Sequence, residues 1–335
     1  MEIVLDVYGG DNAPIEIVKG AVQAVNEKDG YVLTLVGKEN EIKDILSQYT
    51  YPSDRIKIIN ASDVITNDDV PTDAIRKKTD SSLVVGINYL NENDDAKAFV
   101  SAGSTGAVLT GSVLLLRRIR GINRPALCPV LPSVQDKNVL LMDCGANVEC
   151  KAANLLQFAQ MSSAYSKCIN DKDFKPKVGL LSNGTEEKKG SPLNKETYPL
   201  LKSCQTFDFV GNIEGRDILS GDVDVVVCDG YSGNIALKSC EGTALSMFSM
   251  IKQGILSGGL RAKIGYLLLK PVFKGIKTKM DYNKNGGAVL LGLEKIVIKS
   301  HGSSKGETIK NSILQAFDLA EKDIIEKIKN ELASN

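Results

Sequence analysis

The chain has 335 residues, of which 43% are hydrophobic and 24% charged, with 41 basic and 41 acidic side chains. This composition is typical of a globular protein with one large domain or two smaller ones, and it excludes disordered, collagen-like and coiled-coil chains. Proteins that bind nucleic acids are generally basic, whereas the formal net charge of this chain is zero. We therefore expect no nucleic-acid partner.

Short β-branched segments alternate along the chain with longer segments of helical periodicity. The expected strands are Ile3–Val7, Tyr31–Val36, Arg55–Asn60, Lys97–Ser101, Asn138–Asp143, Lys177–Leu181, Phe207–Gly211, Val223–Cys228 and Ile296–Lys299. The expected helices are Ile15–Glu27, Glu39–Gln48, Ser81–Glu92, Gly106–Arg120, Ala152–Ile169 and Glu307–Asn330. Strand–helix alternation of this kind predicts an α/β fold with a mostly parallel, doubly wound sheet.

The strand at Val223–Cys228 is apolar at almost every position, which is typical of a strand covered by helices on both faces. The fold class is therefore expected to be a three-layer α/β/α arrangement. No low-complexity linker or change of composition marks a boundary, so residues 1–335 are expected to form a single domain.

Glycine and small polar residues follow most of the expected strands. The segments are Gly9–Asn12, Gly103–Gly106, Gly145–Asn147, Asn183–Glu186, Asn212–Arg216, Asp229–Asn234 and His301–Ser304. Parallel strands end at one edge of a sheet, where open α/β sheets bind ligands, and small residues and helix N-termini there offer N–H groups to anions. Any one such loop is more often an ordinary turn. Together they predict a donor-rich cleft suited to phosphate.

Familiar nucleotide-binding and nucleophile motifs are absent. No GxGxxG follows the first strand, and neither a Walker A sequence nor a Gly-x-Ser-x-Gly elbow occurs. The seven cysteines lie singly, which favours reduced, packed thiols in a cytosolic protein. The carboxylates show no metal-ligand spacing, so we expect neither a metal nor a cofactor. Because no signal peptide or membrane-spanning window is evident, the protein is expected to be soluble or membrane-peripheral.

Residues 243–280 combine basic and apolar side chains without any acidic residue. Apolar residues recur at helical spacing in two stripes, separated by Ser257–Gly259, and Pro271 is expected to kink or end the second helix. We interpret this segment as an amphipathic helical hairpin. The first stripe, around Leu245–Ile251, is expected to pack on the sheet or a second subunit. The tip, with Leu260, Arg261, Lys263, Ile264, Leu267 and Leu268, suits an anionic membrane surface or an acidic partner.

The loop segments also form an ordered series of motifs. These are Tyr8–Pro14, Ser101–Ala107, Arg124–Leu127, Asp143–Cys150, Asn183–Glu187, Gly211–Asp217, Cys228–Gly230, Gly286–Ala288 and His301–Ser304. In this order the chain resembles the bacterial phosphate acyltransferase (PlsX) family of phospholipid synthesis, from Val4 to about Asn311. One departure is Ser104, which stands where an asparagine is usual, although both side chains can donate a hydrogen bond.

The resemblance implies conversion of acyl-[acyl-carrier-protein] and inorganic phosphate into acyl phosphate and free carrier protein. The acyl phosphate would then supply glycerol-3-phosphate acylation by a separate membrane enzyme. The resemblance also implies a Rossmann-like fold related to phosphotransacetylases and isocitrate-dehydrogenase-like proteins, and a cytoplasmic homodimer attached peripherally to the membrane.

Phosphorolysis of a thioester mainly requires that phosphate be bound, aligned and stabilised during attack. Residues expected to bind phosphate or the acyl donor are Gly10, Asp11, Asn12, Gly103, Ser104, Thr105, Gly106, Asn183, Gly184, Thr185, Asn234, Ser303 and Ser304. Arg216 or Lys188 is expected to offset the phosphate charge, and Asp229 and Asp11 to orient donors or a proton. Asn147 or Asn234 could face the thioester oxygen.

Several alternatives stay open at this stage. His301 is a candidate catalytic residue, although a lone histidine after a strand is more often structural. A covalent route through Cys144, Cys150 or Cys228 is conceivable, although packed thiols are the usual case. The rival functions are a phosphotransacetylase acting on short acyl-CoA, an isocitrate-dehydrogenase-like oxidoreductase, and a non-catalytic membrane-recruited scaffold.

Overall fold

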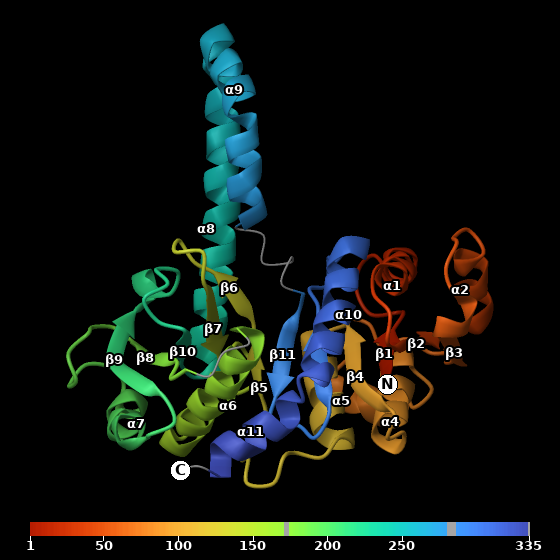
Figure 1. Cartoon of the computed structure of the whole chain (residues 1–335), viewed down its shortest axis with the longest axis horizontal. Coiled ribbons are helices and arrows are strands. Elements are labelled where there is room, and N and C mark those ends of the chain that lie inside the picture. The colour runs from red at the N-terminus through yellow and green to blue at the C-terminus, as the bar shows by residue number, and fades with distance from the viewer. Residues whose placement is uncertain (171–173, 280–285, 334–335) are drawn as a thin grey trace.

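The structure, a computed structural model, describes residues 1–170, 174–279 and 286–333. Its strands form two sheets that lie side by side (Figure 1). The α/β class expected from the sequence is confirmed, but the strands are divided between two sheets. The chain passes from one sheet to the other at Pro129, between two short strands that the sequence pattern did not reveal.

The larger sheet has seven strands in the order β3-β2-β1-β4-β12-β11-β5. Their bounds are β1 (Glu2–Asp6), β2 (Val32–Gly37), β3 (Ile56–Asn60), β4 (Ala96–Ser101), β5 (Ala126–Cys128), β11 (Ala288–Leu291) and β12 (Ile296–Lys299). Strands β3, β2, β1, β4 and β12 are parallel, and β11 runs antiparallel to both of its neighbours. The ends of β1, β4 and β12 therefore lie next to one another.

The smaller sheet has five strands in the order β6-β7-β10-β8-β9. Their bounds are β6 (Val130–Pro132), β7 (Asn138–Met142), β8 (Lys177–Ser182), β9 (Asp208–Glu214) and β10 (Val225–Val227). All neighbours are parallel except β6, which is antiparallel to β7. The expected strand ending at Gly211 continues to Glu214, and a short 3-10 turn follows at Gly215–Asp217.

Helices cover both faces of the sheets. They are α1 (Ile15–Glu27), α2 (Glu39–Leu46), α3 (Pro71–Lys77), α4 (Ser82–Glu92), α5 (Thr105–Leu115), α6 (Ala152–Asn170), α7 (Pro192–Ser203), α8 (Gly230–Ser257), α9 (Gly259–Lys279), α10 (Gly306–Glu321) and α11 (Ile324–Ala333). The expected helix 307–330 is interrupted at Asp323, whose φ of 49° is left-handed. A 3-10 turn also precedes β3 at Ser53–Arg55.

Alternate residues of the central strands enter different cores. On β1, Ile3 and Leu5 belong to one hydrophobic cluster with residues of α1, α6 and α10, whereas Val4 belongs to another with α3, α4 and α5. On β10, Val225 shares the first cluster with Ile3. The two sheets therefore share a core, and apolar residues pack on both faces of the strands, as the three-layer prediction requires.

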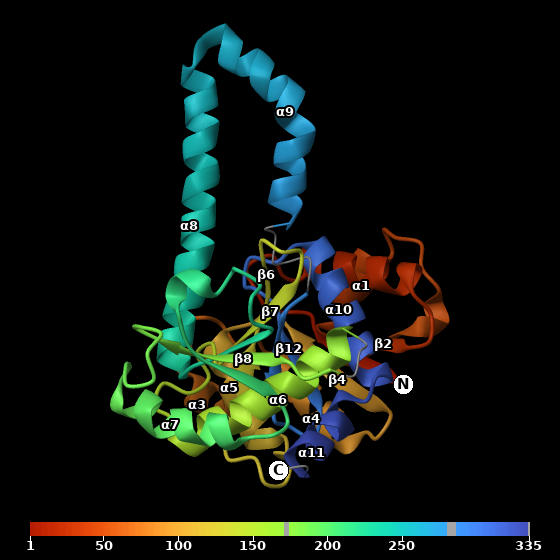
Figure 2. The same cartoon turned by 60° about the vertical axis from the view of Figure 1, so that its left-hand side comes forward.

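The hairpin projects far beyond the sheets (Figures 1 and 2). Helix α8 begins at Gly230, well before the expected start at residue 243, and ends at Ser257, where the predicted turn leads into α9. Helix α9 continues through Pro271 rather than ending there. Met280, and the side chains of Lys277 and Lys279, lie outside the described residues. Over the described ranges, no helix is both long and apolar enough to cross a lipid bilayer.

The apolar stripe of the hairpin is not covered in this chain. Leu245 is 72% exposed and Ile251 39% exposed, so the expectation that this stripe packs on the sheet is wrong. The reason is that only the first turns of α8 contact the smaller sheet, where Ala236 and Leu237 pack against Leu131 and Val226. The rest of the helix extends past the strand ends.

Candidate functional site

A buried carboxylate organises the loops that follow β1 and β4. Asp6, the last residue of β1, accepts hydrogen bonds from the hydroxyls of Ser82 at 2.6 Å and Ser101 at 2.7 Å. Ser101 in turn accepts a hydrogen bond from the Gly103 backbone N–H. Burial raises the pKa of Asp6, and the hydroxyl donors oppose that rise by stabilising its charge. Asp6 thus holds the Gly103–Gly106 loop beside the first glycine loop.

The third loop of this edge is held by backbone and amide contacts. The Asp11 N–H donates to the Gly302 carbonyl at 2.8 Å, and the Asn12 amide donates to the carbonyls of Ser303 and Ser304 at 3.1 Å. Gly10 has a φ of 100°, and a Cβ there would lie 2.9 Å from the Gly302 carbonyl oxygen. The predicted loops therefore lie together, and the side-chain amide of Asn12 joins the first of them to the loop at His301–Ser304.

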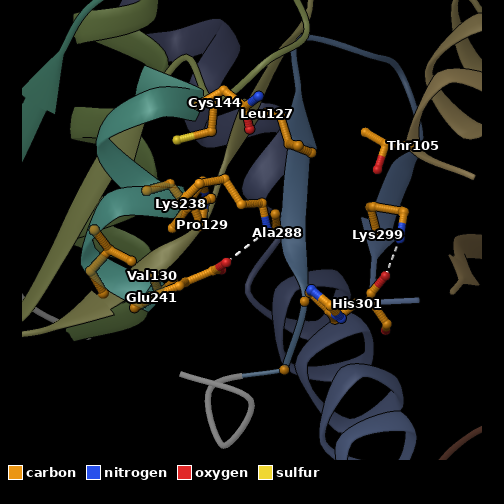
Figure 3. Close-up of a pocket in the computed structure, with 16 residues that line it drawn as sticks. Thr105, Leu127, Pro129, Val130, Cys144, Lys238, Glu241, Ala288, Lys299 and His301 are labelled. Carbon is orange, nitrogen blue, oxygen red and sulfur yellow. Dashed lines mark hydrogen bonds and ion pairs between the residues drawn. The ribbon is translucent and has the colours of Figure 1, made fainter. Parts of the chain in front are cut away.

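A pocket of about 130 Å³ lies between these loops and the beginning of α8 (Figure 3). One side is polar and includes Thr105, at the start of α5, with Lys299, Ser300 and His301 at the end of β12. Across from it, α8 contributes polar and apolar residues, and the short strands β5 and β6 contribute an apolar wall. The residues on that side are Asn234, Leu237, Lys238, Glu241, Cys144, Leu127, Pro129, Val130 and Leu131, while Gly286, Gly287 and Ala288 lie between. This mixture of apolar wall and converging polar groups is typical of a small-molecule site.

The positive charge in the pocket comes from Lys299 and Lys238. The Lys299 ammonium donates to the backbone carbonyls of Ser300 and Ala102 and has no carboxylate partner among the described residues. Burial, aided by the positive charge of Lys238, lowers the pKa of Lys299 to about 8. Lys238 forms an ion pair with Glu241 at 2.7 Å. A half-buried ammonium group without a counter-ion favours an anionic ligand.

His301 lies at the same end of β12. Its Nδ1 accepts the Ser303 N–H at 3.3 Å and also contacts the Ser303 hydroxyl at 2.9 Å. With Nδ1 accepting, neutral imidazole carries its proton on Nε2. Desolvation, together with the positive charge of Lys238, lowers the pKa of His301. At neutral pH His301 is therefore a neutral Nε2–H donor.

The loop after β7 is organised by a second buried carboxylate, Asp143. It accepts hydrogen bonds from the N–H groups of Leu127, Ala146 and Asn147 and from the Asn147 amide. The other amide hydrogen of Asn147 is donated to the Pro125 carbonyl at 2.8 Å. Both donors of the Asn147 side chain are thus used within the protein, so its geometry suits positioning rather than contact with a thioester oxygen.

Asp229 and Asn183 face a different hollow. Asp229 caps α8 by accepting from the Ser232 N–H and hydroxyl, both at 2.8 Å. Asn183 accepts the Gly190 N–H at 2.9 Å. Both line a pocket of about 530 Å³ at the end of the smaller sheet, with Ser182, Asn194 and Leu155. The structure therefore divides the predicted loops between two pockets instead of one cleft.

The expected cations of the smaller sheet do not line the first pocket. Arg216 is 79% exposed and forms an ion pair with Glu214 on its own loop. Lys188 and Thr185 are also exposed, and Gly184 is buried beneath them. Of the serine and threonine candidates, Thr105 lines the pocket, whereas Ser104 precedes α5 and the Ser304 hydroxyl is buried without a partner among the described residues.

The candidate nucleophilic thiols lie in an unfavourable environment for that role. Burial raises the pKa of Cys144 and Cys228 well above the ordinary range of thiols. Both are therefore protonated at neutral pH, and the thiol is a poor nucleophile compared with the thiolate. In the part of the chain that the structure describes, no group of three or more histidine, cysteine or acidic side chains is placed to hold a metal ion.

Sequence reasoning missed five residues that organise this site: Asp6, Asp143, Lys238, Glu241 and Lys299. A signal existed for some of them. Asp6 and Asp143 are charged residues at the ends of strongly apolar strands, and Lys299 is the last residue of a predicted strand. Asn234, Lys238 and Glu241 follow helical i, i+4, i+7 spacing, but the helix was expected to begin later.

The sequence matches a known protein family and curated relatives over nearly its whole length. The sequence profile described as "Fatty acid synthesis protein" matches residues 1–327. A phosphate acyltransferase of Alkaliphilus oremlandii (strain OhILAs) is 47% identical over 335 residues, which is 100% of this chain and 98% of that protein. A phosphate acyltransferase of Clostridium novyi (strain NT) is 46% identical over 333 residues, 99% of this chain and 98% of that protein.

Solved structures resemble the fold at low sequence identity. A phosphotransacetylase from Streptococcus pyogenes has a TM-score of 0.61 at 19% identity, covering 97% of this chain and 94% of that one. A phosphotransacetylase from Staphylococcus aureus has a TM-score of 0.57 at 19% identity, covering 95% of this chain and 94% of that one. These similarities concern the arrangement of strands and helices.

Proposed function

We propose that the acyl donor of this chain is an acyl-[acyl-carrier-protein] and that the acceptor is inorganic phosphate. The reason is that the chain belongs to the fatty acid synthesis protein family. The chain is a phosphate acyltransferase. Its products would be acyl phosphate and free carrier protein, and the acyl phosphate would supply glycerol-3-phosphate acylation by a separate membrane enzyme in phospholipid synthesis. Residues 1–335 would act as one catalytic unit.

The reaction asks little acid–base chemistry of the protein. A phosphate oxygen attacks the thioester carbonyl, a carbon–oxygen bond forms, and the tetrahedral intermediate collapses as the carbon–sulfur bond breaks. The electron pair leaves with sulfur, and a free thiol has a pKa of about 8.5, so the leaving group needs little protonation. Binding phosphate, aligning it and stabilising the oxyanion are the main tasks.

The observation that carries this proposal is the ammonium group of Lys299 in the pocket between the sheets, which has no carboxylate partner among the described residues. Lys299 and Lys238 would offset the charge of phosphate. The Thr105 hydroxyl, the first N–H groups of α5 and the Nε2–H of His301 would donate to its oxygens. Asn234 lies near the beginning of α8, next to Gly145, and would face the thioester oxygen.

The other predicted residues take supporting roles in this arrangement. Gly10, Asp11 and Asn12 would shape the phosphate loops, with Ser303 and Ser304. The pocket lined by Asn183 and Asp229 would accept a neutral polar part of the donor, since its open side chains are mostly amides and hydroxyls. Arg216 and Lys188 would then act at the exterior of this second pocket.

The direct experiment measures the release of free carrier thiol from long-chain acyl-[acyl-carrier-protein] with and without phosphate. We expect release that depends on phosphate and produces acyl phosphate in equal amount. Acetyl-CoA is the comparison substrate, because a phosphotransacetylase would prefer it. Release that is independent of phosphate, or faster with acetyl-CoA than with the carrier-bound donor, would contradict the proposal.

The exposed hairpin supports a cytoplasmic enzyme that is attached to the membrane surface. Leu260 is 75% exposed and Leu268 76% exposed, with Arg261 and Lys263 beside them. An apolar face flanked by cations suits an interface of anionic lipids. The stripe that includes Leu245 and Ile251, both exposed, would pack against the same stripe of a second copy in a homodimer.

A further inference from the structure

A carboxylate lies inside the pocket that is proposed to bind phosphate. Glu241 is carried by α8, one turn after Lys238, and its side chain is only 13% exposed. Figure 3 shows its carboxylate extending from α8 toward the centre of the pocket, on the side opposite His301. A negative charge at this position opposes the binding of any anion, so its presence needs a chemical reason.

The orientation of the Glu241 carboxylate is fixed through one of its oxygens. Lys238 donates to Oε2 at 2.7 Å, and no hydrogen bond to Oε1 comes from any residue that the structure describes. Oε1 is therefore an acceptor that is held in place and available to a ligand. A ligand that binds here must bring a negative charge for Lys299 and a hydrogen for Glu241.

Inorganic phosphate meets both conditions, and sulfate meets only the first. Near neutral pH each phosphate ion keeps at least one O–H group, whereas sulfate of the same shape and charge has none. The phosphate O–H can donate to a carboxylate, which turns a repulsion into a charge-assisted hydrogen bond. Sulfate has no hydrogen to donate, so its oxygens and the Glu241 carboxylate repel each other. This unfavourable contact would let the site discriminate against sulfate.

We propose that Glu241 is a specificity-determining residue that accepts a hydrogen bond from the protonated oxygen of phosphate and excludes sulfate. This inference rests on the proposed phosphate site between Lys238 and Lys299. Asp6 and Asp11 are other carboxylates whose charge acts on Lys299, but neither side chain lines the pocket. Asp6 accepts hydrogen bonds from Ser82 and Ser101, and the backbone N–H of Asp11 holds the Gly302 loop.

The test compares the full-length enzyme with its Glu241→Gln variant. Isothermal titration measures the dissociation constants of sodium phosphate and sodium sulfate, and phosphate-dependent thiol release measures the KM of phosphate and the inhibition constant of sulfate. Loss of a negative charge strengthens the binding of both anions. Loss of the selective hydrogen bond changes their ratio, and we expect the preference for phosphate over sulfate to fall by about ten- to a hundredfold.

Glu307→Gln is the matched control, since Glu307 is an exposed carboxylate in the first turn of α10, beside the same loop but outside the pocket. It removes the same charge and should leave the ratio unchanged. An unchanged ratio in Glu241→Gln, or a fall in Asp11→Asn instead, would overturn the assignment. If titration shows the selectivity while carrier thiol is not released, the acyl donor is wrong and Glu241 keeps its role. If phosphate does not bind at all, both ideas fail.

Discussion

Lys238 and Lys299 reach the same pocket from separate parts of the fold, one on the first turns of α8 and the other at the end of β12. Lys238 forms an ion pair with Glu241, whereas Lys299 has only backbone carbonyls as partners among the described residues. Burial and the charge of Lys238 together lower the pKa of Lys299 to about 8. Lys299 is thus the cation that gains most from a bound anion.

Replacing Lys299 by methionine should weaken phosphate binding selectively. A hydrogen bond to a charged group contributes about 1.5–3 kcal/mol, so we expect the KM of phosphate to rise about tenfold or more. The KM of the acyl donor should change less. Steady-state kinetics of thiol release measures both, with Lys202→Met as control because Lys202 is exposed on α7. The variant Arg216→Ala tests the alternative cation. If it raises the KM of phosphate and Lys299→Met does not, the cation that binds phosphate belongs to the smaller sheet.

The pH dependence of phosphate use should report the ionisation of Lys299. Its ammonium form predominates below pH 8 and is lost as the pH rises through that value, because the pKa lies at about 8. We therefore expect kcat/KM for phosphate, which reports the free enzyme, to fall above pH 8. The Lys299→Met variant should lack this decline. A decline that persists in the variant would mean that another group is responsible.

Asp6 should matter for stability because it is buried and joins three elements. Asp6→Asn keeps the shape of the side chain but replaces one carboxylate oxygen by an amide N–H₂. That group cannot accept the hydrogen bond that the Ser82 or Ser101 hydroxyl now donates. We expect unfolding in urea to show a loss of about 1–3 kcal/mol in the free energy of unfolding. The exposed Asp54→Asn, in the 3-10 turn before β3, is the control. Equal stability of the two variants would contradict the organising role of Asp6.

The membrane role of the hairpin tip can be tested with charged substitutions. The double variant Leu260→Glu, Leu267→Glu places two carboxylates on residues that are 75% and 69% exposed, so the fold should tolerate them. We expect flotation with anionic vesicles to show strongly reduced binding, since the apolar contact is lost and anionic lipids repel the new charges. Val70→Glu, Val210→Glu is the control, because these exposed residues lie away from the hairpin. Binding equal to that of the wild type would exclude the tip.

Much of the fold could be predicted from local pattern. The strand at Ile296–Lys299 and the helix at Ile15–Glu27 have the expected bounds, and the turn at Ser257–Gly259 separates α8 from α9. These features depend on the alternation or periodicity of neighbouring residues, which the sequence displays directly. The short strands β5, β6 and β11 were missed because each has at most one β-branched residue, whereas the equally short Ile296–Lys299 has three.

The glycine-rich loops were also found from the sequence, but not their distribution over two pockets. Arg216 was predicted to bind phosphate because it lies in one of these glycine-containing loops. In the structure it forms an ion pair with Glu214, two residues earlier at the end of β9. Lys238 and Lys299 are distant in the sequence, and only the packing of α8 on the smaller sheet, across the pocket from the end of β12, brings them together.

The sequence by itself thus determined the α/β class, the phosphate-type loops, the family resemblance and the hairpin, because each depends on residue types at short spacing. Tertiary structure alone decided that the strands form two sheets, that Lys299 has no carboxylate partner in the described part of the chain and that Glu241 shares its pocket. The physical reason is that burial and Coulomb interactions depend on distance in space and on exclusion of water, and neither can be read from separation along the chain.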